Sequence, residues 1–326
     1  MRAVGEILRI FLRAGGGYVS GEAVARELGF SRVYVHKLLD NLRKEGFAFH
    51  AVRNRGYRLE KEPDSLHPEL FNALLAERPL PFFKGIRHLG STGSTNADAE
   101  EELAAGAEAP LLVTATEQTA GRGRRGRRWH SPPDRNLYVS AGIRPALAPS
   151  RLQTITLFLG LRLCHFLRDR FALPVLVKWP NDLLVHDRKL AGMLTEARVD
   201  AEQTRDLVFG LGLNGNLAAD ELPGELRPVA TSLQEATGRS VSLSRLAHHV
   251  GGVIAEAMED FLADGVGGEL VDSWPAVDAL RGREVTAGDQ TGTVLGISSS
   301  GSLRLRRPDG SLALLHSGEV SVRPAG

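Results

Sequence analysis

An α+β protein of three successive segments is what the sequence predicts, and three observations support this prediction. Residues 1–62 alternate short helical patterns with glycines and end at a Lys-Glu-Pro-Asp stretch. Residues 65–275 mix longer helical patterns with apolar runs of strand length, and residues 276–326 read as short strands separated by turns. Because a chain of 326 residues exceeds one ordinary core, two or three domains are expected.

The first segment has the pattern of a helix-turn-helix followed by a hairpin. Ser20 can cap a helix that ends at Gly29, and Ser31 can cap a second helix with apolar residues at helical spacing. Phe47–Leu59 then reads as a hairpin with a basic tip, the wing of a winged helix. The side chains expected to contact DNA are Arg32, Tyr34, His36, Lys37, Arg53 and Arg55.

The charge distribution supports this interpretation. Residues 1–62 carry 12 Lys and Arg against 7 Asp and Glu, whereas the remaining residues carry 28 against 32. A basic end on a mildly acidic body favours a nucleic-acid-binding module. A packing module of three helices with a solvated basic face remains the alternative, because helix–Gly–helix patterns are common.

The later elements follow from hydrophobic period and turn residues. In the central segment, helices are expected at 68–77, 96–105, 151–171 and 243–262, and strands at 111–115, 137–143, 175–179 and 207–213. The last segment predicts strands at 284–286, 293–297, 303–306 and 312–315, with a Pro-Asp-Gly turn before the final one. This pattern indicates an α/β or α+β layer domain followed by a small antiparallel barrel or sandwich.

The composition excludes several classes of protein. No apolar run approaches the roughly 20 residues that span a bilayer, and charged residues at helical spacing interrupt the N-terminal apolar stretch, as a signal peptide would not allow. The only cysteine is Cys164, so an intrachain disulfide and cysteine-based zinc or iron–sulfur sites are excluded. We therefore expect a cytoplasmic protein.

An arginine-rich loop is the first stretch that carries chemistry. Gly121, Gly123 and Gly126 match G-x-G-x-x-G, but the chain continues into Arg-Arg-Trp-His-Ser-Pro-Pro, which cannot open the helix of a dinucleotide site. The other motifs of a kinase are missing too. Five arginines within residues 122–128 repel one another until an anion neutralises them, so we interpret the stretch as a mobile loop that closes over a phosphate. A solvated basic loop or a nucleic-acid patch is the alternative.

Three further clusters of polar residues accompany this loop. An apolar strand ends in Lys178, and Lys178 and Lys189 are the only lysines after Lys84 in a chain that otherwise uses arginine. This favours a site at Lys178 that needs a compact ammonium and has no room for a guanidinium. Chance is the alternative, although it explains one retained lysine more easily than two in one motif. Residues 210–216, Gly-Leu-Gly-Leu-Asn-Gly-Asn, allow a close backbone approach, and residues 94–96, Ser-Thr-Asn, either cap a helix or present hydroxyls and an amide to a small polar ring. A structural turn is the alternative for residues 210–216.

Together these motifs resemble those of biotin–protein ligases. The matching stretches are Ser94–Asn96, Gln118–Trp129, Lys178–Asp182, Lys189–Gly192 and Gly210–Asn214, in the order and approximate spacing of that family. With the N-terminal helix-turn-helix, nearly the whole chain is similar to the bifunctional form, ligase and biotin operon repressor in one. The resemblance implies a winged helix over residues 1–62, a ligase domain with a mixed sheet over 65–275 and a small SH3-like β-barrel over 276–326.

The resemblance also implies two reactions. Biotin and Mg-ATP give biotinyl-5′-adenylate, and a lysine of a carboxyl-carrier protein then attacks that anhydride. By matching position, the catalytic charges are Lys178, Arg122 and Arg124, and the biotin-binding groups are Ser94, Thr95, Asn96, Gln118, Gly121, Arg122, Gly123, Arg124, Lys178 and Gly192. The adenylate-binding groups are Arg122, Arg124, Arg125, Trp129, Asn181, Lys189 and Asn214, and no ligand is assigned to Mg²⁺.

As a regulator, such a protein binds operator DNA as a homodimer that the bound adenylate favours. The sequence departs from the family at one point, since Val229, Ala230 and Thr231 stand where the family often carries an aromatic residue over adenine. Two competing hypotheses remain. One is a lipoate–protein ligase, which the Gly-Arg-Gly-Arg-Arg-Gly and Lys-Trp-Pro-Asn-Asp stretches disfavour, and the other is a transcription factor that senses biotin without turnover, which Lys178 and the full arginine loop disfavour.

Overall fold

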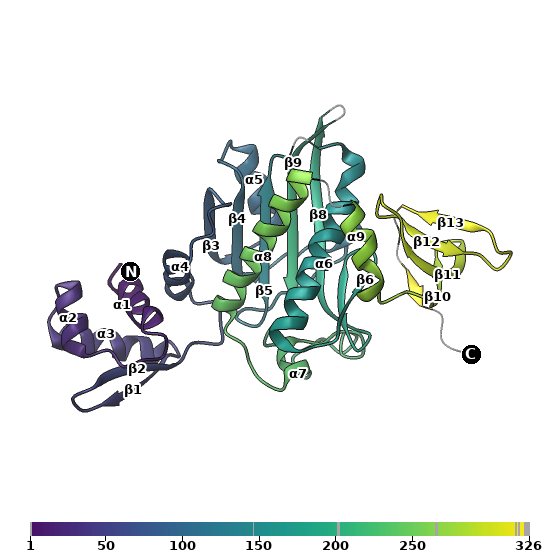
Figure 1. The fold of residues 1–326 in the computed structure, drawn as a ribbon. Helices are drawn as coiled ribbons and strands as arrows, with labels where there is room; N and C mark the ends of the chain where they lie inside the picture. The colour runs from purple at the N-terminus through teal and green to yellow at the C-terminus, as the bar shows by residue number, and fades with distance from the viewer. Residues whose placement is uncertain are drawn as a thin grey trace. The chain divides into compact units, whose positions relative to one another are not determined.

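The computed structural model describes residues 2–145, 147–200, 203–264, 267–316, 318 and 320–322. The chain forms two compact units (Figure 1). The first comprises Met1–Pro81 and Ser240–His249, and the second comprises Phe82–Arg239 and Val250–Gly326. Each unit is described by itself below.

The first unit is a winged helix. Its elements in chain order are α1 (Arg2–Arg13), α2 (Gly21–Leu28), α3 (Arg32–Lys44), β1 (Ala48–Val52), β2 (Gly56–Lys61) and α4 (Pro68–Glu77). The predicted caps are confirmed, because Ser20 Oγ accepts a hydrogen bond from Ala23 N and Ser31 Oγ accepts one from Tyr34 N. Gly29 ends α2 in the left-handed region, at φ 68°. β1 and β2 pair in antiparallel fashion, as expected of a wing.

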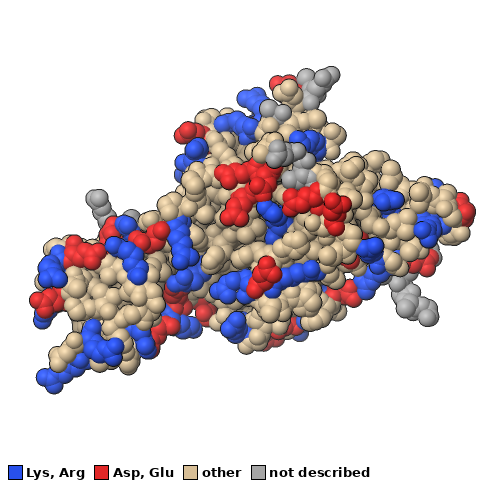
Figure 2. All heavy atoms as spheres, in the orientation of Figure 1, with Lys and Arg blue, Asp and Glu red and all other residues tan. Residues whose placement is uncertain are grey.

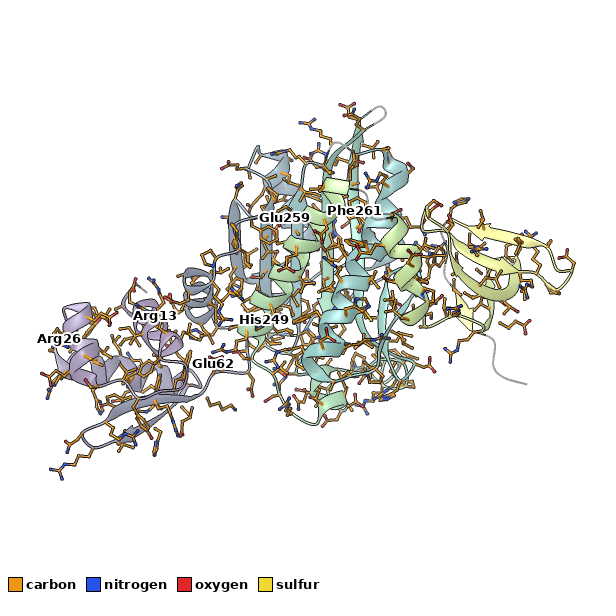
Figure 3. The ribbon with its side chains drawn as sticks, viewed as in Figure 1. Arg13, Arg26, Glu62, His249, Glu259 and Phe261 are labelled. Carbon is orange, nitrogen blue, oxygen red and sulfur yellow. The ribbon has the colours of Figure 1, made fainter. Side chains whose placement is uncertain are left out.

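Helix α4 packs into this unit, although composition assigned it to the central segment. Leu70, Ala73 and Leu74 of α4 share a buried cluster with side chains from α1, α2 and α3. The start of α8 (Leu243–Asp264) also belongs here, since Ser244 Oγ accepts a hydrogen bond from His67 N at 2.8 Å. Arg245 of the same turn pairs with Glu62, which Figure 3 labels. The core of the winged helix is thus completed by residues that follow it in the chain.

The second unit contains a seven-stranded mixed sheet in the order β3-β4-β5-β9-β8-β7-β6. Its strands are β3 (Gly85–Thr92), β4 (Leu111–Gln118), β5 (Leu137–Ile143), β6 (Val175–Lys178), β7 (Asp182–Val185), β8 (Arg188–Asp200) and β9 (Gln203–Leu213). The pair β3–β4 is parallel and the other pairs are antiparallel. The mixed sheet is therefore confirmed, but β3 and most of β8 were not predicted.

Helices cover this sheet. The helices of the unit are α5 (Thr95–Ala104), α6 (Leu152–Phe171), α7 (Leu233–Thr237), the part of α8 from Val250 onward and α9 (Gly267–Ser273). α6 and α8 lie side by side across one face of the sheet, where Phe158 and Phe261 pack with ring centroids 6.4 Å apart (Figures 1 and 3). None of the helices in the described part of the chain is long and apolar enough to span a bilayer.

A five-stranded antiparallel sheet follows, in the order β13-β12-β11-β10-β14. Its strands are β10 (Glu284–Ala287), β11 (Gln290–Ile297), β12 (Leu303–Arg306), β13 (Leu312–Leu315) and β14 (Ser321–Val322). A hydrogen bond ties it to the seven-stranded sheet beside the end of β6, because Trp179 Nε1 donates to Gly301 O at 2.9 Å. This small β domain therefore lies next to the strand end that carries Lys178.

Candidate active site and nucleic-acid interface

A cavity of about 550 Å³ opens in the second unit where β6, β8 and β9 meet the arginine-rich loop. It brings together nearly every residue that the sequence assigned to ligands. Those lining it are Ser94, Thr95, Asn96, Gln118, Arg122, Gly123, Arg124, Arg125, Trp129, Lys178, Asn181, Lys189, Gly192 and Asn214. Gly121 is not among the lining residues, and it packs so closely on Ser131 that a Cβ atom would be 2.6 Å from Ser131 Oγ.

A chain of polar contacts forms the floor at the N-terminus of α5. Thr95 donates to Gln118 Oε1 from its backbone nitrogen at 2.9 Å and from its hydroxyl at 3.1 Å. Ser140 Oγ lies 2.7 Å from Thr95 Oγ1 and 2.6 Å from Asn96 Oδ1. Ser94 precedes α5 without a cap hydrogen bond from its side chain, so its hydroxyl is presented to the cavity. Buried and mutually fixed polar groups of this kind suit a small polar ring.

The amide of Asn96 is engaged within the protein. Its Nδ2 donates to Glu196 Oε2 at 2.7 Å and to Leu194 O at 3.3 Å. A Cβ atom at Gly210 would lie only 2.1 Å from Asn96 Oδ1, so the glycine makes room for this side chain. Asn96 therefore connects the polar floor of the cavity with β8 through these two hydrogen bonds. Glu196 follows the Lys189–Gly192 motif along β8, and nothing in the sequence indicated its contact with Asn96.

The arginine-rich loop folds back on itself beside the floor. Gly123 N donates to Arg127 O at 2.7 Å, and Trp129 N donates to Gly121 O at 2.9 Å. The Trp129 ring lies on the glycines of β8 and β9, because a Cβ atom at Gly212 would be 2.5 Å from this ring and one at Gly192 would be 2.9 Å from it. These two glycines are thus required for the close approach of an indole.

The loop arginines reach several elements. Arg122 Nη1 lies 3.4 Å from Glu100 Oε2 and 3.3 Å from Glu196 Oε1. Arg124 Nη1 lies 3.4 Å from Asn181 Oδ1 and 3.5 Å from Gly318 O, so the loop also contacts the small β domain. The guanidinium groups of Arg122 and Arg124 both border the cavity, as a site for an anion requires.

Two lysines, Lys178 and Lys189, also line the cavity. Lys178 ends β6 and pairs with Asp182 in the β6–β7 register, and its ammonium has no hydrogen-bond or ion-pair partner among the described residues. Lys189 Nζ lies 2.7 Å from Asp182 Oδ1 and 5.2 Å from the centroid of the Trp129 ring. Arg283 and, to a smaller extent, Lys178 hold the pKa of Asp187 below its ordinary value. Lys178 therefore offers an ammonium that the protein leaves available for a ligand.

An aliphatic wall completes the cavity, and the sequence analysis did not find it. Leu217, Leu222 and Ala230 form a buried cluster with Leu226, and all four line the cavity. The segment returns to β8 because Lys189 N donates to Val229 O at 2.7 Å and Thr231 N donates to Lys189 O at 2.9 Å. The sequence analysis had singled out Ala230, but no motif marks the three leucines, which the return of the chain brings to the site.

The residues expected to contact DNA are all exposed on the winged helix, and all but Tyr34 and Arg55 line one concave surface. Arg32, Tyr34, His36 and Lys37 are exposed on α3, and Arg53 and Arg55 are exposed at the tip of the wing. Basic side chains are visible at this tip in Figure 2. The concave surface between α3 and the wing is lined by Arg32, His36, Lys37 and Arg53, all of which can approach a phosphate backbone.

Fold and cavity define a class: a winged-helix unit in one chain with a mixed-sheet domain whose cavity suits a small acid and a nucleotide. Three family models match the chain. The biotin/lipoate A/B protein ligase family covers residues 90–214, an HTH domain covers 5–58, and the biotin protein ligase C terminal domain covers 281–323.

Relatives match along nearly the full length. The chain is 33% identical to the bifunctional ligase/repressor BirA of Salmonella typhimurium, with 97% of each chain covered. It is also 33% identical to the protein of the same name from Escherichia coli, covering 97% of this chain and 96% of that one. A solved structure, the biotin protein ligase from Aquifex aeolicus in complex with biotin and ATP, superposes with a TM-score of 0.64 at 29% identity, over 74% of this chain and 100% of the other. The chain belongs to the family of bifunctional biotin ligase/repressors.

Proposed function

We propose that this protein is an ATP-dependent biotin–protein ligase that also acts as a DNA-binding repressor of biotin synthesis genes. In the first reaction, the biotin carboxylate attacks the α-phosphate of ATP, which gives biotinyl-5′-adenylate and releases pyrophosphate. In the second, a lysine amine of a carboxyl-carrier protein attacks the mixed anhydride, which forms an amide and releases AMP. The observation that carries the proposal is one cavity that holds a buried polar floor, an available lysine and a loop of arginines.

Positioning and charge neutralisation account for the chemistry without a covalent nucleophile of the enzyme. In this proposal, Ser94, Thr95 and Gln118 hold the ureido ring of biotin at the floor. Lys178 lies between the biotin carboxylate and the α-phosphate, where its charge reduces their repulsion and stabilises the negative charge of the transition state. Arg122 and Arg124 neutralise the phosphates and close over the anhydride, which keeps water from it.

The nucleotide end of the cavity relies on apolar contacts, whereas the biotin end relies on polar ones. The aliphatic wall of Leu217, Leu222, Leu226 and Ala230 supports an adenine subsite built from aliphatic side chains in place of the aromatic residue that the family often carries. Trp129 and Lys189 border the same cavity. The two loop arginines and Asn181 lie toward the phosphates in this assignment, and Asn214 faces the nucleoside.

We also propose a place in the cavity for a magnesium ion held mainly by substrate phosphates. Asp182 lines the cavity and carries a carboxylate, and Mg²⁺ is commonly bound by one or two carboxylates together with substrate phosphates. Asp182 is therefore the group we assign to Mg²⁺, which when bound would neutralise phosphate charge. Lys189 beside it balances the carboxylate when the nucleotide is absent.

Regulation follows from coupling the two activities. We propose that adenylate made in excess of the acceptor favours a homodimer that binds operator DNA through α3 and the wing, in the cytoplasm where ATP and operator are found. Such linkage requires that the loop be ordered at different energetic cost in monomer and dimer. Equal sedimentation coefficients with and without biotin and ATP would contradict the ligand-promoted dimer.

The test of the proposed function is biotin-dependent exchange of labelled pyrophosphate into ATP by the purified protein, with lipoate as the parallel substrate. We expect exchange with biotin and none with lipoate. Exchange with lipoate alone would make the protein a lipoate ligase. Exchange with neither would leave a biotin-sensing repressor without turnover, and the residues above would then serve binding only.

A further inference from the structure

Arg122 sits between two carboxylates of different elements. Its Nη1 is 3.4 Å from Glu100 Oε2 on α5 and 3.3 Å from Glu196 Oε1 on β8. The guanidinium is partly exposed, at 42% of its side-chain surface, and the two carboxylates are about one third exposed. The arginine-rich loop is thereby attached to a helix and to the sheet at its first arginine.

Glu196 has a second contact, which continues into the floor of the cavity. While Oε1 faces Arg122, Oε2 accepts a hydrogen bond from Asn96 Nδ2 at 2.7 Å. Asn96 then contacts Ser140, and Ser140 contacts Thr95, at 2.6 and 2.7 Å. Thr95 in turn donates to Gln118. One carboxylate thus connects the loop arginine with the groups assigned to the ureido ring.

The chain of contacts returns to the loop at its other end. Gln118 Nε2 donates to Ser131 Oγ at 3.1 Å, and Ser131 Oγ donates to Trp129 O at 3.1 Å. Trp129 N is bonded to Gly121 O, directly before Arg122. The floor and the loop therefore form a closed circuit, in which Glu196 supplies the only carboxylate link among the contacts just named.

The negative charge of Glu196 matters because the loop beside it is strongly positive. Five arginines within residues 122–128 repel one another, and an adjacent carboxylate offsets part of that repulsion. Burial and the neighbouring charge of Glu196 raise the pKa of Glu100, whereas Arg122 lowers it. Arg198 contributes a smaller stabilisation of the same carboxylate. The two carboxylates are thus close enough to repel each other, and Arg122 is the cation that lies between them.

We propose that Glu196 is a positioning residue that couples closure of the arginine loop to the biotin floor, with Glu100 as a weaker second anchor. Glu196 acts through Arg122 and Asn96, and it does not touch the reacting atoms. Loop order then depends on the Arg122 contact, and floor geometry depends on the Asn96 contact. The inference deepens the proposed function and rests on it for the identity of the ligand.

Three variants of the full-length protein separate the two contacts. Glu196→Ala removes both contacts. Glu196→Gln keeps an oxygen that can accept from Asn96 but loses the charge that holds Arg122. Glu100→Gln, the matched variant, weakens the hold on Arg122 and leaves the contact between Glu196 and Asn96 in place. A thermal melt of each variant checks that it is folded.

The first readout is trypsin cleavage within residues 122–128 of the ligand-free protein, because trypsin cuts after arginine and cuts faster where the backbone leaves its folded contacts. Glu196→Ala should be cut about tenfold faster than the wild type, because a charge-assisted contact and its neighbour are both lost. Glu196→Gln should be cut about three- to fivefold faster, and Glu100→Gln about twofold faster. Wild-type cleavage in Glu196→Ala would overturn the proposal.

The second readout is biotin affinity by calorimetry without ATP, together with the dissociation rate of preformed biotinyl-5′-adenylate. Glu196→Gln should bind biotin within about threefold of the wild type, whereas Glu196→Ala should bind about tenfold more weakly, because only the alanine variant releases Asn96. Both variants should release the adenylate about three- to tenfold faster. Tighter biotin binding by Glu196→Ala would mean that the carboxylates compete with the ligand for Arg122, and would overturn the proposal.

Failure of the proposed function gives a different result. A wild-type protein that neither binds biotin nor forms an adenylate would refute the ligase assignment, while the trypsin readout would still test whether Glu196 orders the loop. Equal effects of Glu196→Gln and Glu196→Ala on biotin affinity would show that the contact with Asn96 does not maintain the floor. This result would refute the proposed roles of the two contacts even in an active ligase.

Discussion

The basic surface of the winged helix and the cavity of the ligase domain both collect cationic side chains, but they hold them in different ways. On the winged helix, Arg32 pairs with the exposed Glu22, and His36 Nδ1 lies 2.9 Å from Asp40 Oδ2. In the cavity, Arg122 is joined through Glu196 to a buried chain of hydroxyls and amides. Exposed pairs are easily exchanged for phosphates, whereas a buried network fixes one geometry. The difference suits a polyanion in one case and a small ligand in the other.

The wing shows how an exposed arginine can still be oriented. The guanidinium of Arg55 lies 4.5 Å from the centroid of the Tyr18 ring and that of Arg58 lies 5.1 Å from it. Tyr18 Oη is hydrogen-bonded to His50 Nδ1 at 2.7 Å. A tyrosine thus limits the rotamers of neighbouring arginines without burying their charge.

The largest expected effect lies in the cavity. Lys178→Ala should lower biotin-dependent pyrophosphate exchange by at least about 100-fold, because it removes the charge that meets the transition state in a partly buried site. Operator binding by the ligand-free protein should be unchanged. The exposed Lys84→Ala is the matched control, and exchange in Lys178→Ala at the rate of this control would contradict the assignment.

A packing change in the same cavity should come next. Gly212→Ala places a methyl group 2.5 Å from the Trp129 ring, so the indole must move and carry the arginine loop with it. We expect adenylation to fall about 10- to 100-fold and the tryptophan fluorescence to shift. Gly224→Ala, where an added methyl meets nothing within 4 Å, serves as the control. Unchanged fluorescence and an unchanged adenylation rate would show that the position of Trp129 does not depend on its contact with Gly212.

On the winged helix, each exposed charge should matter less. The double variant Arg53→Ala/Arg55→Ala should weaken operator binding about tenfold and reduce the slope of log K against log salt by about one per arginine removed. Adenylation should stay at the wild-type rate. Operator titrations at several salt concentrations measure this, with the exposed Arg205→Ala as the control. An unaltered salt slope would show that Arg53 and Arg55 of the wing do not contact the DNA phosphates.

The smallest effect is expected at the aliphatic wall. Leu226→Ala should raise the KM for ATP about three- to fivefold, because part of one apolar side chain is lost from the adenine subsite. The KM for biotin should not change, since the polar floor is untouched. Leu312→Ala, on the exposed face of β13, is the control for steady-state kinetics. A change in the KM for biotin alone would contradict the assignment of the aliphatic wall to adenine and would place biotin there instead.

Elements with strong local signals could be predicted from the sequence. The caps Ser20 and Ser31 and the glycine at 29 determine the helix-turn-helix, and α4, β5, β12 and β13 begin and end where the sequence placed them. β3 and most of β8 could not be predicted in this way. β8 is half exposed and rich in charged residues, so its extended form depends on pairing with β9 over ten residue pairs.

The sequence by itself determined the family and the order of the segments, and every residue that it assigned to biotin or the adenylate lines the cavity except Gly121, because each motif carries its chemistry locally. Only the tertiary structure decided how these motifs are joined. Glu196 meets Arg122 and Asn96, and Ala230 meets Lys189, across long stretches of chain, through strand pairing and the return of a loop. Such contacts depend on register and packing, which act between segments and leave no pattern within any one of them.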